Sequence, residues 1–470
     1  MMTLIIVLLF LMGYVLIGTA HLTNVNKAAI AMFMATAGWV FYICYGTDFV
    51  MSQHPDEYID FLSGAPASSS AVKFFIYDSI FLKYVGKAAA VVMFLLATMS
   101  IIELLNNNGC FDFISQWIRT RNSKRLLWTL TGVTFIISAN LDNLTTTTMM
   151  LVIMRSIVQN RRQRMLIGSA VVLAANAGGG FTVIGDPAGV IMWGNEAVTA
   201  TNFSVYLFLP AMVAWVVPSF FISRILPERL DVEWPAMPYR GDDTNLNSWQ
   251  RIVMLFVGIG GLWFIPTFHN ITKLSPFLGA LCVLSVLWVV NEAFNRKLIQ
   301  SDRMVQRRQP LSVEYGSIQT ILFVMGIMLA LGVVAETGFF STVSEFIDYN
   351  IHNVWIVGAI AGIVSGVVDT FTVAMTSLSL YPVVDAEQMG LWGDAEYMAN
   401  FVQNGAYWKI IAFSTSIGGC ILCFTSASGL ALMSMERIHI GWYFKNITPK
   451  VLAGWLLGLI ILWAEVYFIG

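Results

Sequence analysis

Three aspartates lie within long apolar stretches of the sequence, where an ionised side chain is costly. Asp142 and Asp369 stand near the middle of two such stretches, and Asp186 follows a glycine-rich run in a third. A carboxylate at bilayer depth usually faces a cavity and takes part in transport. The alternative is an acid that stays protonated and hydrogen-bonded for helix packing. We expect no intramembrane Lys or Arg to pair with these acids, which favours transport, more strongly for Asp142 and Asp186 than for Asp369.

Other oxygen-bearing side chains lie close to these acids in the sequence. Asn176 precedes Asp186 in the same apolar stretch, and Thr145 follows Asp142 at the start of a threonine run. A single threonine often bonds only the carbonyl four residues back, but Thr145 has a counterpart, Thr372, in the later stretch. Carboxylate, amide, hydroxyl and free carbonyl oxygens together make a site that suits sodium or lithium. We therefore expect Asp142, Asp186 and Asn176 to bind sodium.

A carboxylate that binds sodium can bind a proton instead. If the two ions compete for Asp142 and Asp186, one site exchanges them across the membrane. Glu103 lies near the end of an earlier apolar stretch, where it is either a proton relay or a solvated helix end. The scattered histidines and the five cysteines form no metal-spaced cluster, so we expect packing thiols and no cofactor beyond the transported ion.

Glycine and proline interrupt the segment that carries Asp186. Three consecutive glycines occupy 178–180, and the run Gly185-Asp-Pro-Ala-Gly189 follows them. Both residue types weaken the hydrogen-bond ladder of a helix. Unwound backbone at bilayer depth persists only where it lines a cavity or is buried in protein. We expect broken helices at mid-membrane, with free carbonyls and half-helix ends facing the bound ion.

The elements that position these groups are predicted to be membrane-spanning helices. Of the 470 residues, 57% are hydrophobic and 11% charged, and the mean hydropathy is +0.71, which excludes a water-soluble fold. The net charge of −2 gives no reason to expect nucleic acid. The apolar start of the chain lacks a basic region and is expected to be a first span, not a removed signal. Ten spans are predicted, at 3–20, 28–45, 85–105, 166–194, 199–223, 252–268, 275–293, 316–336, 405–434 and 450–468.

Two further apolar stretches, 126–154 and 354–383, are predicted to be re-entrant hairpins. Basic residues flank the first on both sides, which places both of its ends in the cytoplasm. Acidic residues, with no Lys or Arg nearby, flank the second, which is therefore entered from outside. The resulting multi-pass topology in an inner (cell) membrane has an external N-terminus and collects the basic residues in cytoplasmic loops, including one at 21–27.

The two predicted hairpins resemble each other, which indicates an internal repeat. The run Ser138-Ala-Asn-Leu-Asp-Asn-Leu-Thr145 matches Ser365-Gly-Val-Val-Asp-Thr-Phe-Thr372. In the span after each hairpin, Asn176-Ala-Gly-Gly179 matches Ser416-Ile-Gly-Gly419. The motifs therefore recur in the same order and in matching topological positions.

Because the loop charges orient the two halves in opposite senses, the repeat is predicted to be inverted. The expected fold is an all-α polytopic membrane protein with five spans and one hairpin in each half. The halves are 1–223 and 252–470, joined by a cytoplasmic linker at 224–251.

At these motifs the chain resembles an NhaD-type sodium/proton antiporter of the ion transporter superfamily. The runs Ser138 to Thr147 and Asn176 to Asp186 carry the resemblance, and the run from Ser416 matches more weakly. The second hairpin departs from the family pattern at Thr370, where the family usually has Asn. The resemblance implies exchange of sodium or lithium for protons and a transport domain that moves on a fixed scaffold, an arrangement for which a homodimer is common. It also implies functional roles for Glu103, Ser138, Asp142, Asn143, Thr145, Asn176, Asp186, Asp369 and Ser416.

The same residues bear on three other possible functions. A sodium-coupled dicarboxylate carrier or an arsenite carrier of the same architecture would want neutral hairpin tips or a cationic group for its anion. An intramembrane aspartyl protease commonly carries Gly-x-Gly-Asp, but here Val183-Ile-Gly-Asp186 lacks the first glycine. A channel is disfavoured because two facing hairpins suit alternating access. The sequence therefore predicts a secondary transporter, not an enzyme, with membrane lipid, sodium and protons as its partners.

Overall fold

The computed structural model describes residues 2–23, 25–63, 66–111, 113–114, 118, 120–231, 246–301, 315–385 and 395–469. Within these residues the chain consists of helices and loops, with two isolated backbone bridges. Seven of the described helices are long and apolar enough to cross a membrane. The chain is therefore a multi-pass membrane protein of the all-α class, as its composition predicts.

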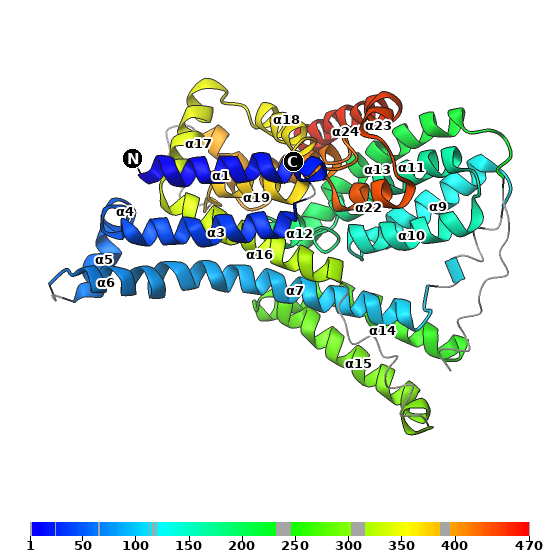
Figure 1. The fold of residues 1–470 in the computed structure, drawn as a ribbon, viewed down its shortest axis with the longest axis horizontal. Coiled ribbons are helices and arrows are strands. Elements are labelled where there is room, and N and C mark those ends of the chain that lie inside the picture. Colours follow the sequence, from blue (N-terminus) through cyan, green and yellow to red (C-terminus); the bar gives the residue numbers. More distant parts are fainter. Residues whose placement is uncertain are drawn as a thin grey trace.

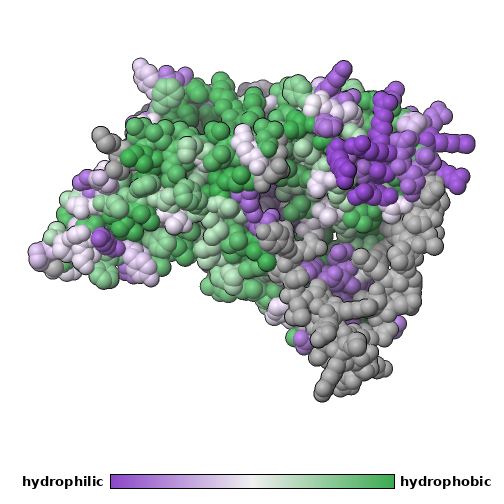
Figure 2. All heavy atoms as spheres, viewed as in Figure 1, coloured by the Kyte–Doolittle hydropathy of each residue, from purple (hydrophilic) through white to green (hydrophobic). Residues whose placement is uncertain are grey.

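The surface of these helices is apolar over much of the molecule. Large side chains that a soluble protein would bury are exposed, among them Phe256 at 76%, Trp249 at 70% and Trp263 at 69%. Figure 2 shows apolar residues across the left and centre of the view and hydrophilic residues gathered at the right. Exposed apolar surface of this extent is stable only against lipid.

The first half contains both long helices and helices too short to cross a bilayer. An unbroken run of 39 residues, Ser69–Asn107, passes through one π-helical segment, η1, before it continues as α7. Asparagine side chains cap the starts of α3, α9 and α11, where the first N–H groups have no helical partner. The helices are α1 (Met2–Gly18), α2 (Ala20–Thr23), α3 (Lys27–Cys44), α4 (Gly46–Gln53), α5 (Pro55–Leu62), α6 (Ser69–Phe75), η1 (Ile76–Phe81), α7 (Leu82–Asn107), α9 (Ser123–Ser138), α10 (Asn143–Ile157), α11 (Arg161–Gly180), α12 (Pro187–Gly194) and α13 (Ala200–Ile225).

The second half contains a similar mixture. It begins with three long helices, and short helices follow before the long C-terminal one. The helices are α14 (Ser248–Thr272), α15 (Pro276–Ser301), α16 (Tyr315–Glu336), α17 (Phe339–Asn350), α18 (Val354–Ser365), α19 (Thr370–Leu380), α20 (Ala395–Met398), η5 (Ala399–Phe401), α21 (Ala406–Gly418), α22 (Ala427–Glu436), α23 (Ile440–Asn446) and α24 (Thr448–Ile469). Residues 232–245 of the predicted linker lie outside the described residues.

The predicted spans correspond to these helices, with two instructive differences. Seven of the ten predicted spans lie within the seven continuous apolar helices, and the segment 3–20 lies mainly in the shorter apolar helix α1. The segment 166–194 divides into α11 and α12, and 405–434 divides into α21 and α22. The prediction that glycine-rich runs break the helices is therefore confirmed for the segment that carries Asp186.

The helices form two packed groups. In one group α3 packs against α1 and α16, α16 against α7, and α7 against α15. Figure 1 shows α1, α3 and α7 running along the long axis of the view. In the other group α9, α10, α18 and α19 pack around the broken helices, and α13 and α24 pack against each other beside α21. Contacts of α12 with α7 and of α19 with α16 join the groups.

A buried ion cluster ties helices of the two halves together at one end of this second group. Arg164 donates from Nε to both carboxylate oxygens of Glu436, at 2.9 and 3.0 Å, and Arg155 approaches one of them at 3.4 Å. Arg161 donates to the main-chain oxygens of Glu436 and Arg437 at 3.1 and 2.9 Å. Glu436 is only 2% exposed. Because the acid is buried and surrounded by guanidinium groups, it fixes the end of α22 to α10 and α11.

Candidate cation site at the helix breaks

Oxygen-bearing side chains cap four short helices of the second packed group. Asp142 caps α10, Asp186 caps α12 and Asp369 caps α19, while Ser426 caps α22. A cap oxygen accepts hydrogen bonds from backbone N–H groups that would otherwise lack partners, and a helix N-terminus favours negative charge. All three predicted aspartates are thus held at the starts of helices.

The Asp142 carboxylate uses one of its oxygens for this cap. Oδ2 accepts from the backbone N–H groups of Leu144 and Thr145, both at 3.1 Å, and from the Thr145 hydroxyl at 3.3 Å. Within the described residues no hydrogen bond or ion pair reaches Oδ1. Thr145 lies against Asp142, and the second carboxylate oxygen remains available to an ion.

Asn143 connects the turn before α10 to Asp186. Its side-chain amide lies 3.3 Å from Oδ2 of Asp186 and 2.8 Å from Oγ of Ser138. With the amide rotated by half a turn, its nitrogen donates to Ser138 Oγ and to the Ala175 and Gly185 carbonyls at 2.8, 2.9 and 3.3 Å. Ser138 has one hydroxyl hydrogen, which then donates to the Ala175 carbonyl at 2.8 Å. This rotated amide satisfies every donor and turns its oxygen toward the Asp186 carboxylate.

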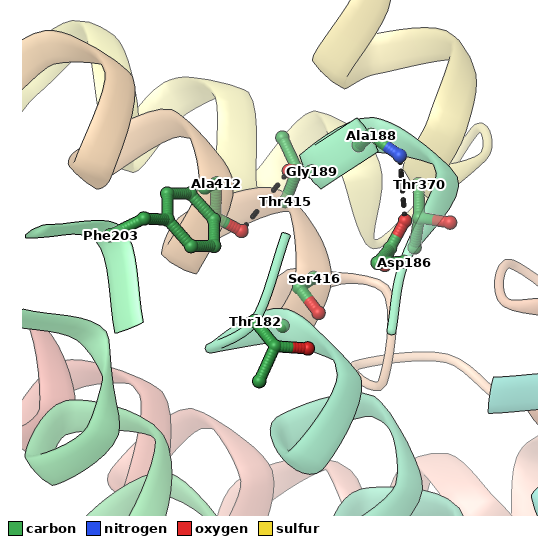
Figure 3. Close-up of a pocket in the computed structure, with 10 residues that line it drawn as sticks. Thr182, Asp186, Ala188, Gly189, Phe203, Thr370, Ala412, Thr415 and Ser416 are labelled. Atoms are coloured by element: carbon green, nitrogen blue, oxygen red, sulfur yellow. Dashed lines mark hydrogen bonds between the residues drawn. The ribbon is translucent and has the colours of Figure 1, made fainter. Parts of the chain in front are cut away.

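Asp186 lies beside a small cleft formed at the helix breaks. Its Oδ1 accepts from the Ala188 N–H at 3.0 Å, which fixes the carboxylate at the start of α12. Figure 3 shows Asp186 with Thr370 on one side of the cleft and other polar side chains below them. The cleft thus brings together residues of α12, α19 and α21.

Asn176 and Ser416 join the two halves where α11 meets α21. The Ser416 hydroxyl donates to the Asn176 carbonyl at 2.9 Å. The Asn176 amide nitrogen lies 3.1 Å from Cys420 Sγ and 3.5 Å from Ser426 Oγ. The Asn176 side chain therefore points into the second half, whereas Asn143 contacts Asp186.

Asp369 has a basic partner that the sequence analysis did not anticipate. Lys27 lies with its Nζ 3.2 Å from Asp369 Oδ1, and the two side chains are 19% and 9% exposed. Our expectation that no Lys or Arg pairs with the embedded acids is therefore wrong for Asp369. Lys27, assigned from its flanking loop to the cytoplasm, begins α3 and reaches the start of α19 instead. Among the described residues, no ion pair includes Asp142 or Asp186.

Two further charged residues, Glu103 and Lys409, lie away from the cleft. Glu103 is half-buried near the end of α7 and does not line the cleft. Lys409, which falls within the predicted span 405–434, is 6% exposed and lies over the Tyr206 ring at 3.6 Å. A cation–π contact of this kind stabilises a desolvated ammonium. Lys409 is therefore a buried basic residue within a predicted span, but it does not line the cleft.

Thr182 is a cleft residue that the sequence analysis missed. Its hydroxyl donates to the Ala139 carbonyl at 2.6 Å and accepts from the Gly185 N–H at 3.1 Å. These bonds tie the broken part of the α11–α12 segment to the turn between α9 and α10. The sequence did contain a signal for Thr182, because it lies between two glycine runs. Backbone groups in such a broken segment lose their helical hydrogen-bond partners, and a hydroxyl can replace them.

The polar contacts recur at equivalent positions in the two halves. Ser138 donates to the Ala175 carbonyl and Ser365 to the Thr415 carbonyl, both at 2.8 Å. Each serine precedes a capping aspartate, and each carbonyl belongs to the following broken helix. The sequence motifs therefore mark pairs of residues that make the same contact.

Close backbone packing recurs in the same way. A methyl group added at Gly178 would collide with the Phe135 carbonyl, and one added at Gly418 would collide with the Gly362 carbonyl. In both halves a glycine of the broken helix thus lies directly against the preceding short helix. No larger residue fits either crossing without movement of backbone.

Comparison with known proteins places this arrangement in a family of transporters. The model of the CitMHS family, described as citrate transporter, matches residues 1–402. Sodium/proton antiporter 2 of Arabidopsis thaliana is 28% identical over 457 residues, covering 96% of this chain and 97% of that protein. Sodium/proton antiporter 1 of the same plant is 29% identical over 453 residues, covering 96% and 70%. The Na+/H+ antiporter NhaD of Vibrio cholerae is 25% identical over 404 residues, covering 79% and 77%.

These matches confirm the resemblance to NhaD-type antiporters that the two motifs indicated. They also remove the intramembrane protease from consideration, because the family and these relatives are transporters. Since the family model spans most of the sequence, the chain belongs to the CitMHS family of membrane transporters.

Proposed function

We propose that this chain exchanges sodium or lithium for protons across a membrane. The observation that carries the proposal is a pair of carboxylates, Asp142 and Asp186, connected by Asn143 and without an ion-pair partner among the described residues. Two buried acids at helix breaks are stable when a cation or protons neutralise them. The relatives named sodium/proton antiporters give independent support.

In the proposed site, sodium lies between the free oxygen of Asp142, the Asp186 carboxylate and the Asn143 amide oxygen. The rotated amide supports this assignment because its oxygen then faces Asp186. We infer that Asn143 supplies the amide ligand, and that Asn176 and Ser416 instead hold the broken helices against each other. Oxygen ligands of this kind suit a hard cation, and the proposed chemistry requires no further cofactor.

Exchange follows from competition for the same two carboxylates. Sodium is stabilised when both are ionised, and protonation of either removes part of the charge that holds it. A site that releases protons when it takes sodium, and opens to one side at a time, couples the two ion gradients. Glu103 at the end of α7 is proposed as a relay for the released protons.

The proposed architecture is an inverted repeat with two re-entrant hairpins, α9–α10 and α18–α19. The equivalent serine and glycine contacts of the two halves support the repeat. The hairpin arms have 16, 15, 12 and 11 residues, each shorter than the roughly 20 that a crossing needs. The halves are proposed at 1–223 and 252–470, with an external N-terminus in an inner membrane. Lipid would cover the exposed apolar surface, and a homodimer is the proposed assembly.

The direct test uses everted vesicles from cells that lack their own sodium/proton antiporters. Addition of sodium should dequench a pH-sensitive dye for the wild-type chain. Asp142→Asn and Asp186→Asn should each abolish the response, whereas Asp56→Asn, which alters an exposed acid of α5, should retain it. Undiminished exchange in both site variants, at equal protein level in the membrane, would refute the site.

The family description favours one alternative, an anion carrier for citrate or a dicarboxylate. Such a carrier needs a basic group that faces its substrate. Lys27 is neutralised by Asp369, and Lys409 lies over Tyr206 away from the cleft residues. Asp186 on the cleft would instead repel a carboxylate substrate.

A further inference from the structure

Asp142 and Asp369 occupy equivalent places in the two halves but differ in their partners. In each, Oδ2 accepts from a threonine hydroxyl one turn into the following helix, Thr145 at 3.3 Å and Thr372 at 3.1 Å. Oδ1 of Asp369 faces the Lys27 ammonium at 3.2 Å. In the described part of the chain nothing comparable reaches Oδ1 of Asp142.

The ammonium comes from outside the hairpin that contains Asp369. Lys27 is the first residue of α3, directly after Asn26, whose side chain caps that helix at the Ala28 N–H at 2.8 Å. Helix α3 packs against α1 and α16. From α1, Tyr14 donates to the Thr372 carbonyl at 3.2 Å and so holds α1 against α19. The first helices of the chain therefore deliver a fixed positive charge to the second-half acid.

The two sites also differ in charge. At the position equivalent to Asp186 the second half has Ser426, which caps α22 as Asp186 caps α12. The first-half site thus holds two carboxylates and no basic partner among the described residues, whereas the second holds one carboxylate and one ammonium. The second site is electrically satisfied by the chain's own side chains, and the first is not.

We propose that the Lys27 ammonium occupies, in the second half, the position that the transported cation takes in the first half. The folded chain then binds one sodium ion and not two. This inference rests on the proposed function for its account of the first site. It also gives that ion a location, against Oδ1 of Asp142, because Oδ1 is the oxygen that faces Lys27 in the equivalent acid.

Removal of the ammonium should convert the second half into an additional cation site. Lys27→Met leaves the buried Asp369 carboxylate without its ion-pair partner and leaves the residues around it unchanged. The number of sodium ions bound per chain can be measured by equilibrium dialysis of the purified full-length protein against radioactive sodium at alkaline pH. We expect one ion for the wild type and for Lys87→Met, which removes an exposed lysine of α7, and two for Lys27→Met. The double variant Lys27→Met/Asp369→Asn should return to one.

The same measurement separates this inference from the proposed function. If the wild type and Lys27→Met both bind one ion, Lys27 does not occupy a cation position, while the antiporter site stands. If the wild type binds none and Lys27→Met binds one, Lys27 does occupy a cation position in the second half, whereas the proposed first-half site fails. Two ions on the wild type, or none on either protein, would overturn the inference. Size-exclusion profiles of the single and double variants check that the protein used in the binding measurement is folded. The single variant should also show a steeper sodium dependence of exchange than the wild type.

Discussion

The Asn143 amide lies 3.3 Å from Oδ2 of Asp186, which connects the turn before α10 to the break before α12. These residues are far apart in the sequence, and each sits at the start of its own short helix. Asn143 directly follows Asp142 in the chain. The contact therefore joins the two capping acids, Asp142 and Asp186, in one proposed site.

Asn143→Ala should weaken sodium binding while leaving the chain folded. The change removes a ligand and leaves the Asp186 carboxylate without its amide neighbour. In the rotated orientation the amide oxygen faces the proposed ion, and loss of a polar contact to a charged group costs about 1.5–3 kcal/mol, so the sodium concentration that gives half-maximal exchange should rise at least about tenfold. Asn140→Ala is the matched control, because Asn140 lies in the same turn and accepts from the Trp263 indole. Equal half-saturation in the two variants would contradict the assignment.

Gly178→Ala should destabilise the protein through backbone collision. The new methyl group would meet the Phe135 carbonyl, which belongs to a helix and cannot rotate away. Overpacking of this kind costs about 1–3 kcal/mol, so the apparent melting temperature in detergent should fall. Gly260→Ala is the control, since no atom lies within 4 Å of its added methyl group. That substitution should be neutral or stabilising, by up to about 1 kcal/mol.

Glu436→Gln should cost more stability than loss of any exposed charge at the same end of the molecule. The amide cannot neutralise Arg164, whose Nε lies 2.9 Å from the carboxylate. Breaking a buried ion pair costs about 3–5 kcal/mol. Unfolding in mixed micelles of increasing denaturing detergent measures this loss. Arg162→Gln, at an exposed arginine of α11, should change stability by less than about 1 kcal/mol. An equally small change for Glu436→Gln would show that the ion cluster does not stabilise the fold.

Citrate should be neither transported nor inhibitory. The cleft beside Asp186 carries a carboxylate, and the buried ammonium groups of Lys27 and Lys409 are occupied by Asp369 and the Tyr206 ring. Proteoliposomes that exchange sodium for protons should therefore show no uptake of radiolabelled citrate above protein-free liposomes. Sodium-dependent citrate uptake would contradict this prediction and would support an anion carrier instead.

Much of the architecture could be predicted because membrane insertion imposes strong local rules. Apolar length predicted the spans, and glycine runs predicted where the segment carrying Asp186 breaks. The recurring motifs could be found because the same contact, from Ser138 or Ser365 to a carbonyl of the broken helix, uses the same residue type in both places. These signals are local in sequence and need no knowledge of distant partners.

The pairing of distant residues could not be predicted in the same way. The sequence predicts Lys27 at the end of a loop, next to other polar residues, and nothing nearby shows that it reaches Asp369. Similarly, Asn143 and Asn176 are both amides near acids, and only their packing shows that one contacts Asp186 and the other contacts Cys420. Partner choice depends on tertiary geometry, and a single sequence gives no direct measure of it.

The position of Glu436 has a consequence for how the chain is made. Its carboxylate is 272 positions after Arg164, the arginine that it neutralises, so it leaves the ribosome long after α10 and α11 have been synthesised. Until then, α10 and α11 can pack against α9, but the arginines at their ends lack the buried carboxylate that neutralises them. A nascent chain stopped before α22 would therefore leave these arginines without their carboxylate, and the helices that carry the proposed ion site would gain this last fastening only when nearly the entire polypeptide is made.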